Sequence, residues 1–338
     1  MSQSQENTPL ALHLIALIIL WIVVCGALSA MLLLDVRSTG QYRTLRYALQ
    51  AGYVVALLWY LSRAGPSVNQ LPELRTQFLS RWTYGAWVPV IVMTALLALT
   101  ALSDDGTDLV LLLLIVATLW ILVAWRREIR LRAVGQGVAI ALIAYLAGRP
   151  FLASGFAGER TVLLLPALAA PMYVAGGLLF DRTRLGGIQL RARRYGKALK
   201  GVLAGCLLFV PLGLLNAADG SPGSGITWVT EWWMPLSLPW FSGISEEVWF
   251  RLLLLGLCFF LLRPAFRAHP AVAVVAAILI SGIIFGLGHG RTIERFLTTG
   301  LLYGVPLGTL FARRDWEHAV GAHYMVNMIP WVMVFLER

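Results

Sequence analysis

The stretch SGISEEVWFRLLLLGLCFFLL, residues 242–262, places three charged residues near the start of an otherwise apolar segment. The segment is long enough to cross a bilayer as a helix, which takes about 20 residues. Glu246, Glu247 and Arg251 therefore lie where a charge is costly, so that each of them indicates a function or a specific partner.

The composition of the whole chain is that of a membrane protein. Of its 338 residues, 59% are hydrophobic and 13% are charged, and the mean hydropathy is +0.76. Soluble domains typically contain about 45–50% apolar and about 25% charged residues. These values exclude an ordinary soluble globule, and they also exclude a disordered chain, which needs the opposite composition.

Apolar runs recur along the chain and predict an all-α fold, a polytopic transmembrane bundle of about eleven spans. The catalytic-type residues occur in the C-terminal third. The predicted spans are 9–34, 47–62, 82–102, 109–125, 133–148, 161–180, 201–216, 236–262, 271–290, 296–312 and 317–336. No long soluble domain fits between them.

The net charge of +10 comes from basic residues in short loops between apolar runs. Loops 126–132 and 181–200 are strongly basic and the loops that alternate with them are acidic or nearly neutral, with 35–46 as the exception. This pattern follows the positive-inside rule and predicts a cytoplasmic N-terminus. The basicity is thus explained by topology, and no nucleic-acid partner is expected.

Helical spacing separates the roles of the three charged residues in 242–262. Glu247 and Arg251 stand at i and i+4 with the glutamate first, the favourable order for an ion pair on a helix. Glu246 points about 100° away around the helix and has no cation on its own face. A carboxylate of this kind suits general acid–base chemistry. The alternative is that all three residues only pair and pack near the membrane interface.

Two later spans bring further polar side chains into apolar surroundings. His289 ends the span 271–290, and His323 and Asn327 share one helical face in the span 317–336. The alternative is that each of these residues has only a structural role, because such residues also form hydrogen bonds that hold membrane helices together. Three spans that together supply a carboxylate, two imidazoles and an amide indicate a common site.

Glycines recur every four residues in two neighbouring spans, a spacing that lets membrane helices approach closely. The two sets are Gly282, Gly286 and Gly290, and Gly300, Gly304 and Gly308. Close packing is therefore predicted on this side of the bundle.

The three motifs, in this order, resemble those of the CPBP family, the CAAX-processing and bacteriocin-processing intramembrane endopeptidases also called the Abi family. They read Glu246-Glu247-Val-Trp-Phe-Arg251, Phe285-Gly-Leu-Gly-His289 and His323-Tyr-Met-Val-Asn327. Leu252 departs from the glycine that many members have after the arginine. The resemblance covers about residues 236–336, which suggests a protease core at 236–338 and membrane helices of unassigned role at 1–235.

The resemblance implies an intramembrane glutamic-type peptidase that hydrolyses a membrane-associated protein or peptide. Glu246 would activate the water with help from His289, while His323 and Asn327 would stabilise the oxyanion. Glu247 and Arg251 keep the role of a structural ion pair. The implied location is the lipid bilayer of a bacterial plasma membrane.

No cofactor is expected, although zinc bound by Glu246, His289 and His323 is an alternative that the ligand types permit. The sequence lacks the His-Glu-x-x-His helix of common zinc peptidases, and asparagine is a poor zinc ligand. The cysteines lie in separate apolar runs and predict neither a metal site nor a disulfide framework. They are Cys25, Cys206 and Cys258.

Two other classes of function stay open. Intramembrane glutamate and histidine also form proton relays in transporters. A transporter would, however, show an inverted repeat with broken helices in both halves, and the polar residues here crowd into one third of the chain. The other alternative is a non-catalytic scaffold or immunity protein that keeps the family fold and would tolerate loss of Glu246.

Overall fold

The predicted all-helical fold is confirmed in the part of the chain that the structure describes. The computed structural model describes residue 15, residues 17–26, 40–64, 106–154, 159–218, 229–290, residue 293 and residues 296–336. These segments contain helices, short turns and no strand. The predicted span 82–102 and part of the span 9–34 lie outside the described residues.

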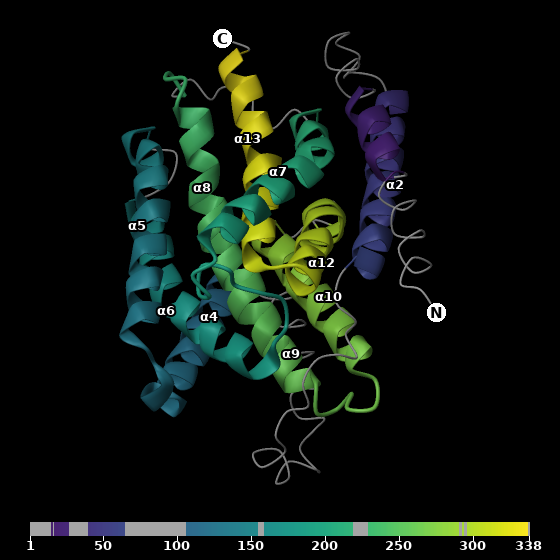
Figure 1. Cartoon of the computed structure of the whole chain (residues 1–338). Coiled ribbons are helices and arrows are strands. Elements are labelled where there is room, and N and C mark those ends of the chain that lie inside the picture. Colours follow the sequence, from purple (N-terminus) through teal and green to yellow (C-terminus); the bar gives the residue numbers. More distant parts are fainter. Residues whose placement is uncertain are drawn as a thin grey trace.

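The helices form a bundle (Figure 1). The N-terminal helices are α2 (Gly40–Ala64), α4 (Gly106–Ala124), η4 (Arg126–Glu128), α5 (Leu131–Ser154), α6 (Glu159–Thr183) and α7 (Tyr195–Ala218). The C-terminal ones are α8 (Met234–Glu246), η5 (Glu247–Leu255), α9 (Gly256–Leu262), α10 (Pro270–Gly288), η6 (Phe296–Gly304), α12 (Val305–Arg313) and α13 (Trp316–Leu336).

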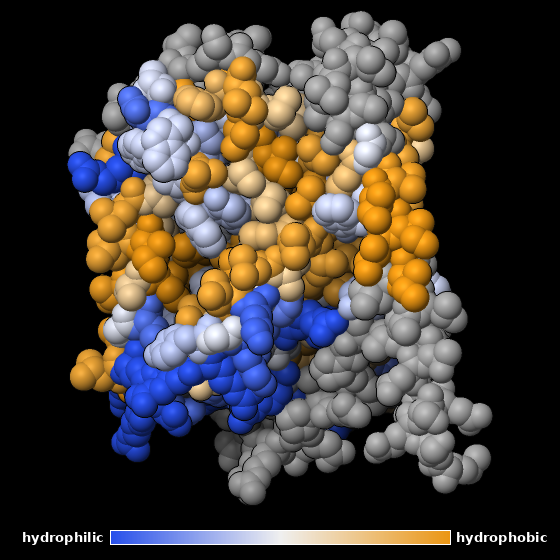
Figure 2. All heavy atoms as spheres, turned by 45° about the horizontal axis from the view of Figure 1, so that its top comes forward, coloured by the Kyte–Doolittle hydropathy of each residue, from blue (hydrophilic) through white to orange (hydrophobic). Residues whose placement is uncertain are grey.

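Five of the described helices are long and apolar enough to cross a membrane. These candidate spans are Leu131–Leu152, Val162–Thr183, Tyr195–Ala218, Pro270–Gly288 and Trp316–Leu336, and two shorter apolar helices cover Leu17–Gly26 and Val110–Ala124. A broad apolar belt covers the face of the molecule in Figure 2 and is bordered below by a hydrophilic region. The protein is thus an integral membrane protein, while a total of about eleven spans stays a prediction.

One helical run, from Met234 to Leu262, passes through the middle of the bundle and includes the segment η5, which is π-helical. All nine residues of η5 are buried, its two charged residues included. Its leucines belong to the largest hydrophobic cluster, together with residues of α6 and α10. The costly charges near its start are therefore held in a closely packed interior. Insertions of π-helix within α-helices are frequent at functional sites.

Glycines bring the backbones of α7 and α13 into contact. A Cβ at Gly205 would collide with the His318 carbonyl, and a Cβ at Gly321 would collide with the Val202 carbonyl. Both collisions involve backbone atoms, which cannot move aside as a flexible side chain can. This contact fixes α13, the helix that carries His323, against α7.

The predicted glycine packing between the two neighbouring spans is also found. A Cβ at Gly282 would lie 3.1 Å from the Gly300 carbonyl oxygen, and a Cβ at Gly304 would lie 2.9 Å from the Gly282 Cα. Helices α10 and η6 therefore touch through their glycines. The contact holds α10, and with it His289 at its end, close to the rest of the C-terminal bundle.

The basic loops gather at one end of the bundle. Arg132 donates to the Arg191 carbonyl at 3.0 Å, and Arg182 pairs with Glu128 at 2.5 Å. The Trp316 backbone N–H donates to the Gly187 carbonyl at 2.8 Å. The positive-inside rule assigns these loops to one side of the membrane. Their contacts at one end of the bundle agree with that assignment. That this side is cytoplasmic stays a prediction.

Candidate active site

The site lies where α8, η5 and α13 pack side by side in opposite directions. Along α13 the partners run in reverse order, since His323 meets Glu247 whereas Asn327, one turn later, meets Ser242. Aromatic packing fixes this register, because the rings of Trp240 and Tyr324 lie 4.3 Å apart between their centroids.

The position of His289 follows from the way α10 ends. Gly290 has a φ of +146°, a backbone conformation that glycine adopts without steric cost. The helix therefore stops directly after Gly288, and the backbone N–H of His289 still donates to the Gly286 carbonyl at 3.1 Å. The imidazole is held at the end of α10 and faces α8.

Glu246 lies between two imidazoles. Its Oε2 atom is 3.4 Å from Nε2 of His289 and 3.7 Å from Nε2 of His323. The side chain of Glu246 is 19% exposed and that of His289 is 36% exposed, whereas His323 is buried. The structure thus brings together three of the four residues predicted to be catalytic, and two of them keep some access to the surface of the bundle.

The hydrogen bond of Nδ1 of His289 determines whether its Nε2 atom is a donor or an acceptor. Its Nδ1 lies 2.8 Å from the Phe285 carbonyl oxygen, and because a carbonyl only accepts, Nδ1 must carry the proton. In a neutral ring the Nε2 atom is then an acceptor that faces a carboxylate. The two groups attract one another when a proton sits on either of them or when a water donates to both. The arrangement suits the sharing of a water proton.

Glu247 has two partners, one for each carboxylate oxygen. Its Oε2 lies 3.3 Å from Nε of Arg251, so the predicted i, i+4 pair is present. Its Oε1 accepts a hydrogen bond from Nδ1 of His323 at 2.7 Å. The sequence motifs gave no indication of this second contact. Glu247 therefore joins the buried arginine to the imidazole that faces Glu246.

Phe285 fills the space between the charged groups. The guanidinium of Arg251 lies 4.2 Å from the centroid of its ring. The rings of His289 and His323 lie 4.5 and 5.8 Å from it. A cation over an aromatic face is attracted by the ring, so Phe285 supports Arg251 while it packs against both imidazoles.

Asn327 lies one helical turn from His323 and is held by a residue that the sequence analysis did not single out. Its Nδ2 donates to Oγ of Ser242 at 2.9 Å. Ser242 precedes Glu246 by one turn of α8, so Asn327 contacts the face of α8 that also carries Glu246. An amide nitrogen has two N–H groups, and one of them is left for a further acceptor.

Three of these side chains are of types that can bind a metal ion. Glu246, His289 and His323 converge through one carboxylate oxygen and two Nε2 atoms. Within the described residues, no group of three histidine, cysteine, aspartate or glutamate side chains has an arrangement that could hold a metal ion. The three cysteines are free.

A carboxylate between two imidazoles, inside an apolar helix bundle, can take part in acid–base chemistry. Residues 228–329 match the family model described as type II CAAX prenyl endopeptidase Rce1-like. This segment is therefore similar to the CPBP/CAAX protease family that the three motifs indicated, which is a family of peptidases. Comparisons with curated proteins and with solved structures found no match.

Proposed function

We propose that the protein is an intramembrane endopeptidase that cleaves a peptide bond of a membrane-associated protein or peptide by direct attack of water. The observation that supports this most directly is the position of Glu246 Oε2 between the Nε2 atoms of His289 and His323. The family match of residues 228–329 supports peptide-bond hydrolysis over a proton relay or a non-catalytic scaffold.

In this proposal the water binds between Glu246 and His289. Glu246 accepts one proton of the water as the oxygen attacks the carbonyl carbon, and it later delivers a proton to the leaving amine. The Phe285 carbonyl keeps the His289 ring oriented, with Nε2 toward the water. No covalent intermediate with the enzyme is needed.

The developing oxyanion needs hydrogen-bond donors, and in this proposal His323 and Asn327 supply them. The Nδ1 atom of His323 is bonded to Glu247, so Nε2 can donate when the ring carries protons on both nitrogens. The Glu247 carboxylate would then balance the charge of the ring. Asn327 would donate the N–H group that Ser242 does not accept. Donors placed in advance at such a site contribute about 2.7–4 kcal/mol each to the transition state.

The apolar surface of the bundle confines the substrate class to chains that reach the membrane (Figure 2). The side chains of Glu246 and His289 are 19% and 36% exposed at the surface of the bundle. A substrate would therefore approach through the bilayer or its interface. We further propose a bacterial plasma membrane with the basic loops in the cytoplasm, as the charge pattern suggests.

The decisive experiment compares membrane peptides from cells that express the wild type or Glu246→Gln. The amide keeps the shape of the carboxylate and removes the proton acceptor, so uncleaved substrate should accumulate at unchanged protein abundance. Glu231→Gln is the matched control, because Glu231 is exposed before α8 and its loss should leave cleavage intact. Cleavage that persists in a normally abundant Glu246→Gln protein would contradict the proposal.

A further inference from the structure

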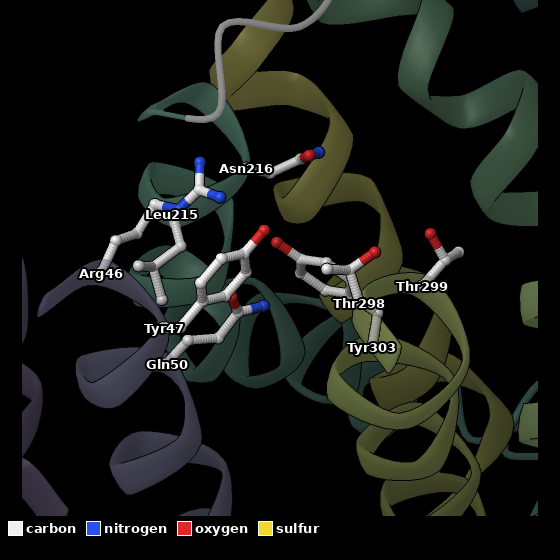
Figure 3. Close-up of a pocket in the computed structure, with 8 residues that line it drawn as sticks. All are labelled: Arg46, Tyr47, Gln50, Leu215, Asn216, Thr298, Thr299 and Tyr303. Carbon is white, nitrogen blue, oxygen red and sulfur yellow. The ribbon is translucent and has the colours of Figure 1, made fainter. Parts of the chain in front are cut away.

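A second polar site is a hollow between α2, α7 and η6 (Figure 3), and none of the candidate active-site residues lines it. The hollow measures about 300 Å³ with the space at its open mouth. Within the part of the chain that the structure describes, eight residues line it: Arg46, Tyr47, Gln50, Leu215, Asn216, Thr298, Thr299 and Tyr303. Seven of the eight are polar or carry a hydroxyl group, which is unusual for an apolar bundle.

Every polar side chain in the hollow has at least one hydrogen-bond donor, although the Asn216 amide already donates to the Val326 carbonyl at 3.1 Å and the Tyr303 hydroxyl to the Leu212 carbonyl at 3.4 Å. Tyr47 and Gln50 point from α2 toward Thr298 and Tyr303 of η6 (Figure 3). Gln50 is only 3% exposed, and its Nε2 atom has no hydrogen-bond partner in the described part of the chain. A buried donor without a partner is costly, so this amide is available to a ligand that accepts hydrogen bonds.

Arg46 supplies positive charge at the edge of the hollow. It is 4% exposed, and its guanidinium lies 4.6 Å from the centroid of the Tyr47 ring. Among the eight lining residues it is the only charged one. A guanidinium beside amide and hydroxyl donors matches an oxyanion, and the planar fork of arginine suits phosphate or carboxylate oxygens.

The hollow lies near one end of the bundle, where a membrane-spanning bundle would meet the lipid headgroups. Arg46 stands near the start of α2, Asn216 near the end of α7 and Thr298 near the start of η6. All three therefore lie near one end of the bundle. The other end of α2 meets the basic end, where Arg313 Nε donates to the Leu61 carbonyl at 3.1 Å. The hollow is thus on the side opposite the basic loops.

Two of the lining residues are each preceded in the sequence by an exposed leucine. Leu45, next to Arg46, is 48% exposed, and Leu297, next to Thr298, is 46% exposed. A ligand with an anionic head and apolar chains would satisfy both the donors inside and the leucines outside. We infer that the hollow binds the phosphate group of an anionic phospholipid whose acyl chains lie along α2 and η6.

The test is native mass spectrometry of the full chain in detergent, titrated with phosphatidylglycerol or with zwitterionic phosphatidylcholine. Wild type should bind phosphatidylglycerol more tightly by about fivefold or more, as expected for one basic residue near an anionic lipid. Arg46→Gln should remove this preference. Arg149→Gln is the matched control, because Arg149 is exposed near the end of α5 and makes the same charge change.

Gln50→Leu provides a second variant that should fold, because it removes a buried polar group without a partner. This variant should bind phosphatidylglycerol more weakly than the wild type does and bind phosphatidylcholine equally well. Equal binding of the two lipids by the wild type, or an unchanged preference in both variants, would overturn the inference. Displacement of the lipid by an equal concentration of inorganic phosphate would make the hollow a free-phosphate site. Displacement by a peptide with a free C-terminal carboxylate, but not by its amide, would make it a peptide site.

Discussion

Nδ1 of His323 lies 2.7 Å from Oε1 of Glu247, and the other oxygen of the same carboxylate faces Nε of Arg251 at 3.3 Å. All three side chains are buried. The pair that the helical spacing assigned to structure alone therefore also reaches the candidate active site. Glu247 orients the imidazole that faces Glu246, and Arg251 holds Glu247.

Glu247→Gln should accordingly reduce both stability and turnover. Arg251 would be left buried with its charge unbalanced, which typically costs about 3–5 kcal/mol, and His323 would lose the carboxylate that orients it. Thermal unfolding in detergent gives the first effect, and the kcat of the folded fraction gives the second.

Arg251→Lys separates the two effects, because it keeps the positive charge and leaves the His323 contact in place. It should lower stability and leave the kcat of the folded fraction nearer to that of the wild type. If the Glu247→Gln protein unfolds more easily but keeps the kcat of the wild type, the role of Glu247 is purely structural.

The sequence was most informative where a physical cost left a visible pattern. Charged residues in an apolar helix are rare because they are expensive, so Glu246, Glu247 and Arg251 stood out. The spacing of Glu247 and Arg251 then predicted their pairing, which the structure confirms. The glycines at 282, 300 and 304 likewise predicted a close helix contact that is present.

Contacts between segments that lie far apart in the sequence left no pattern from which they could be predicted. Ser242 is one small polar residue among many, and only the register of α8 against α13 brings it to Asn327. Gly205 and Gly321 lie 116 positions apart, and each meets the backbone of the other helix. The second partner of Glu247 and the hollow at Arg46 also depend on packing that helical periodicity does not encode.

Metal dependence is open to a direct test. Purified protein should keep its activity after exhaustive chelation, and elemental analysis should find no stoichiometric zinc, because the proposed water is activated by Glu246 and His289. The assay is cleavage of a fluorogenic peptide in detergent before and after chelation. One zinc per chain, with activity lost on stripping and regained on return, would show that Glu246, His289 and His323 act as ligands instead.

Asp315 lies at the basic end of the bundle, and its surroundings lead us to expect that the stability of the protein depends on pH. It accepts hydrogen bonds from Nδ1 of His318 at 2.6 Å and from Nε2 of Gln189 at 3.2 Å. Burial alone would raise the pKa of Asp315, but the contacts with His318 and Gln189 outweigh burial, so its pKa lies below the ordinary 3.8. A carboxyl whose pKa is lowered on folding stabilises the fold above its unfolded pKa.

This stabilisation should be complete at neutral pH and be lost as the pH falls below about 3.8 toward the lowered pKa. Asp315→Asn should therefore unfold more easily than wild type at neutral pH, and the difference should shrink in acid. Asp181→Asn is the control, since Asp181 pairs with Arg191 at the surface, where ion pairs contribute little. A gap between wild type and Asp315→Asn that stays constant with pH would contradict this account.

Asn327 distinguishes an oxyanion donor from a residue that only holds helices together. Its amide does not titrate near neutral pH, so a proton relay has little use for it, whereas an oxyanion forms in the transition state and gains from its N–H group. Asn327→Ala should lower kcat about 10²–10³-fold and change KM little, because the lost hydrogen bond is made mainly in the transition state.

Ser242→Ala provides the matched comparison, because it removes the group that Asn327 Nδ2 contacts at 2.9 Å and leaves the amide itself in place. It should reduce kcat less than Asn327→Ala, and the double variant should resemble Asn327→Ala alone, since residues that act as a unit are not additive. A rise in KM with unchanged kcat in Asn327→Ala would make the residue a substrate contact. Unchanged kinetics together with lower stability in both variants would leave the pair as a helix contact, and the chemistry would then belong to Glu246 and the two histidines.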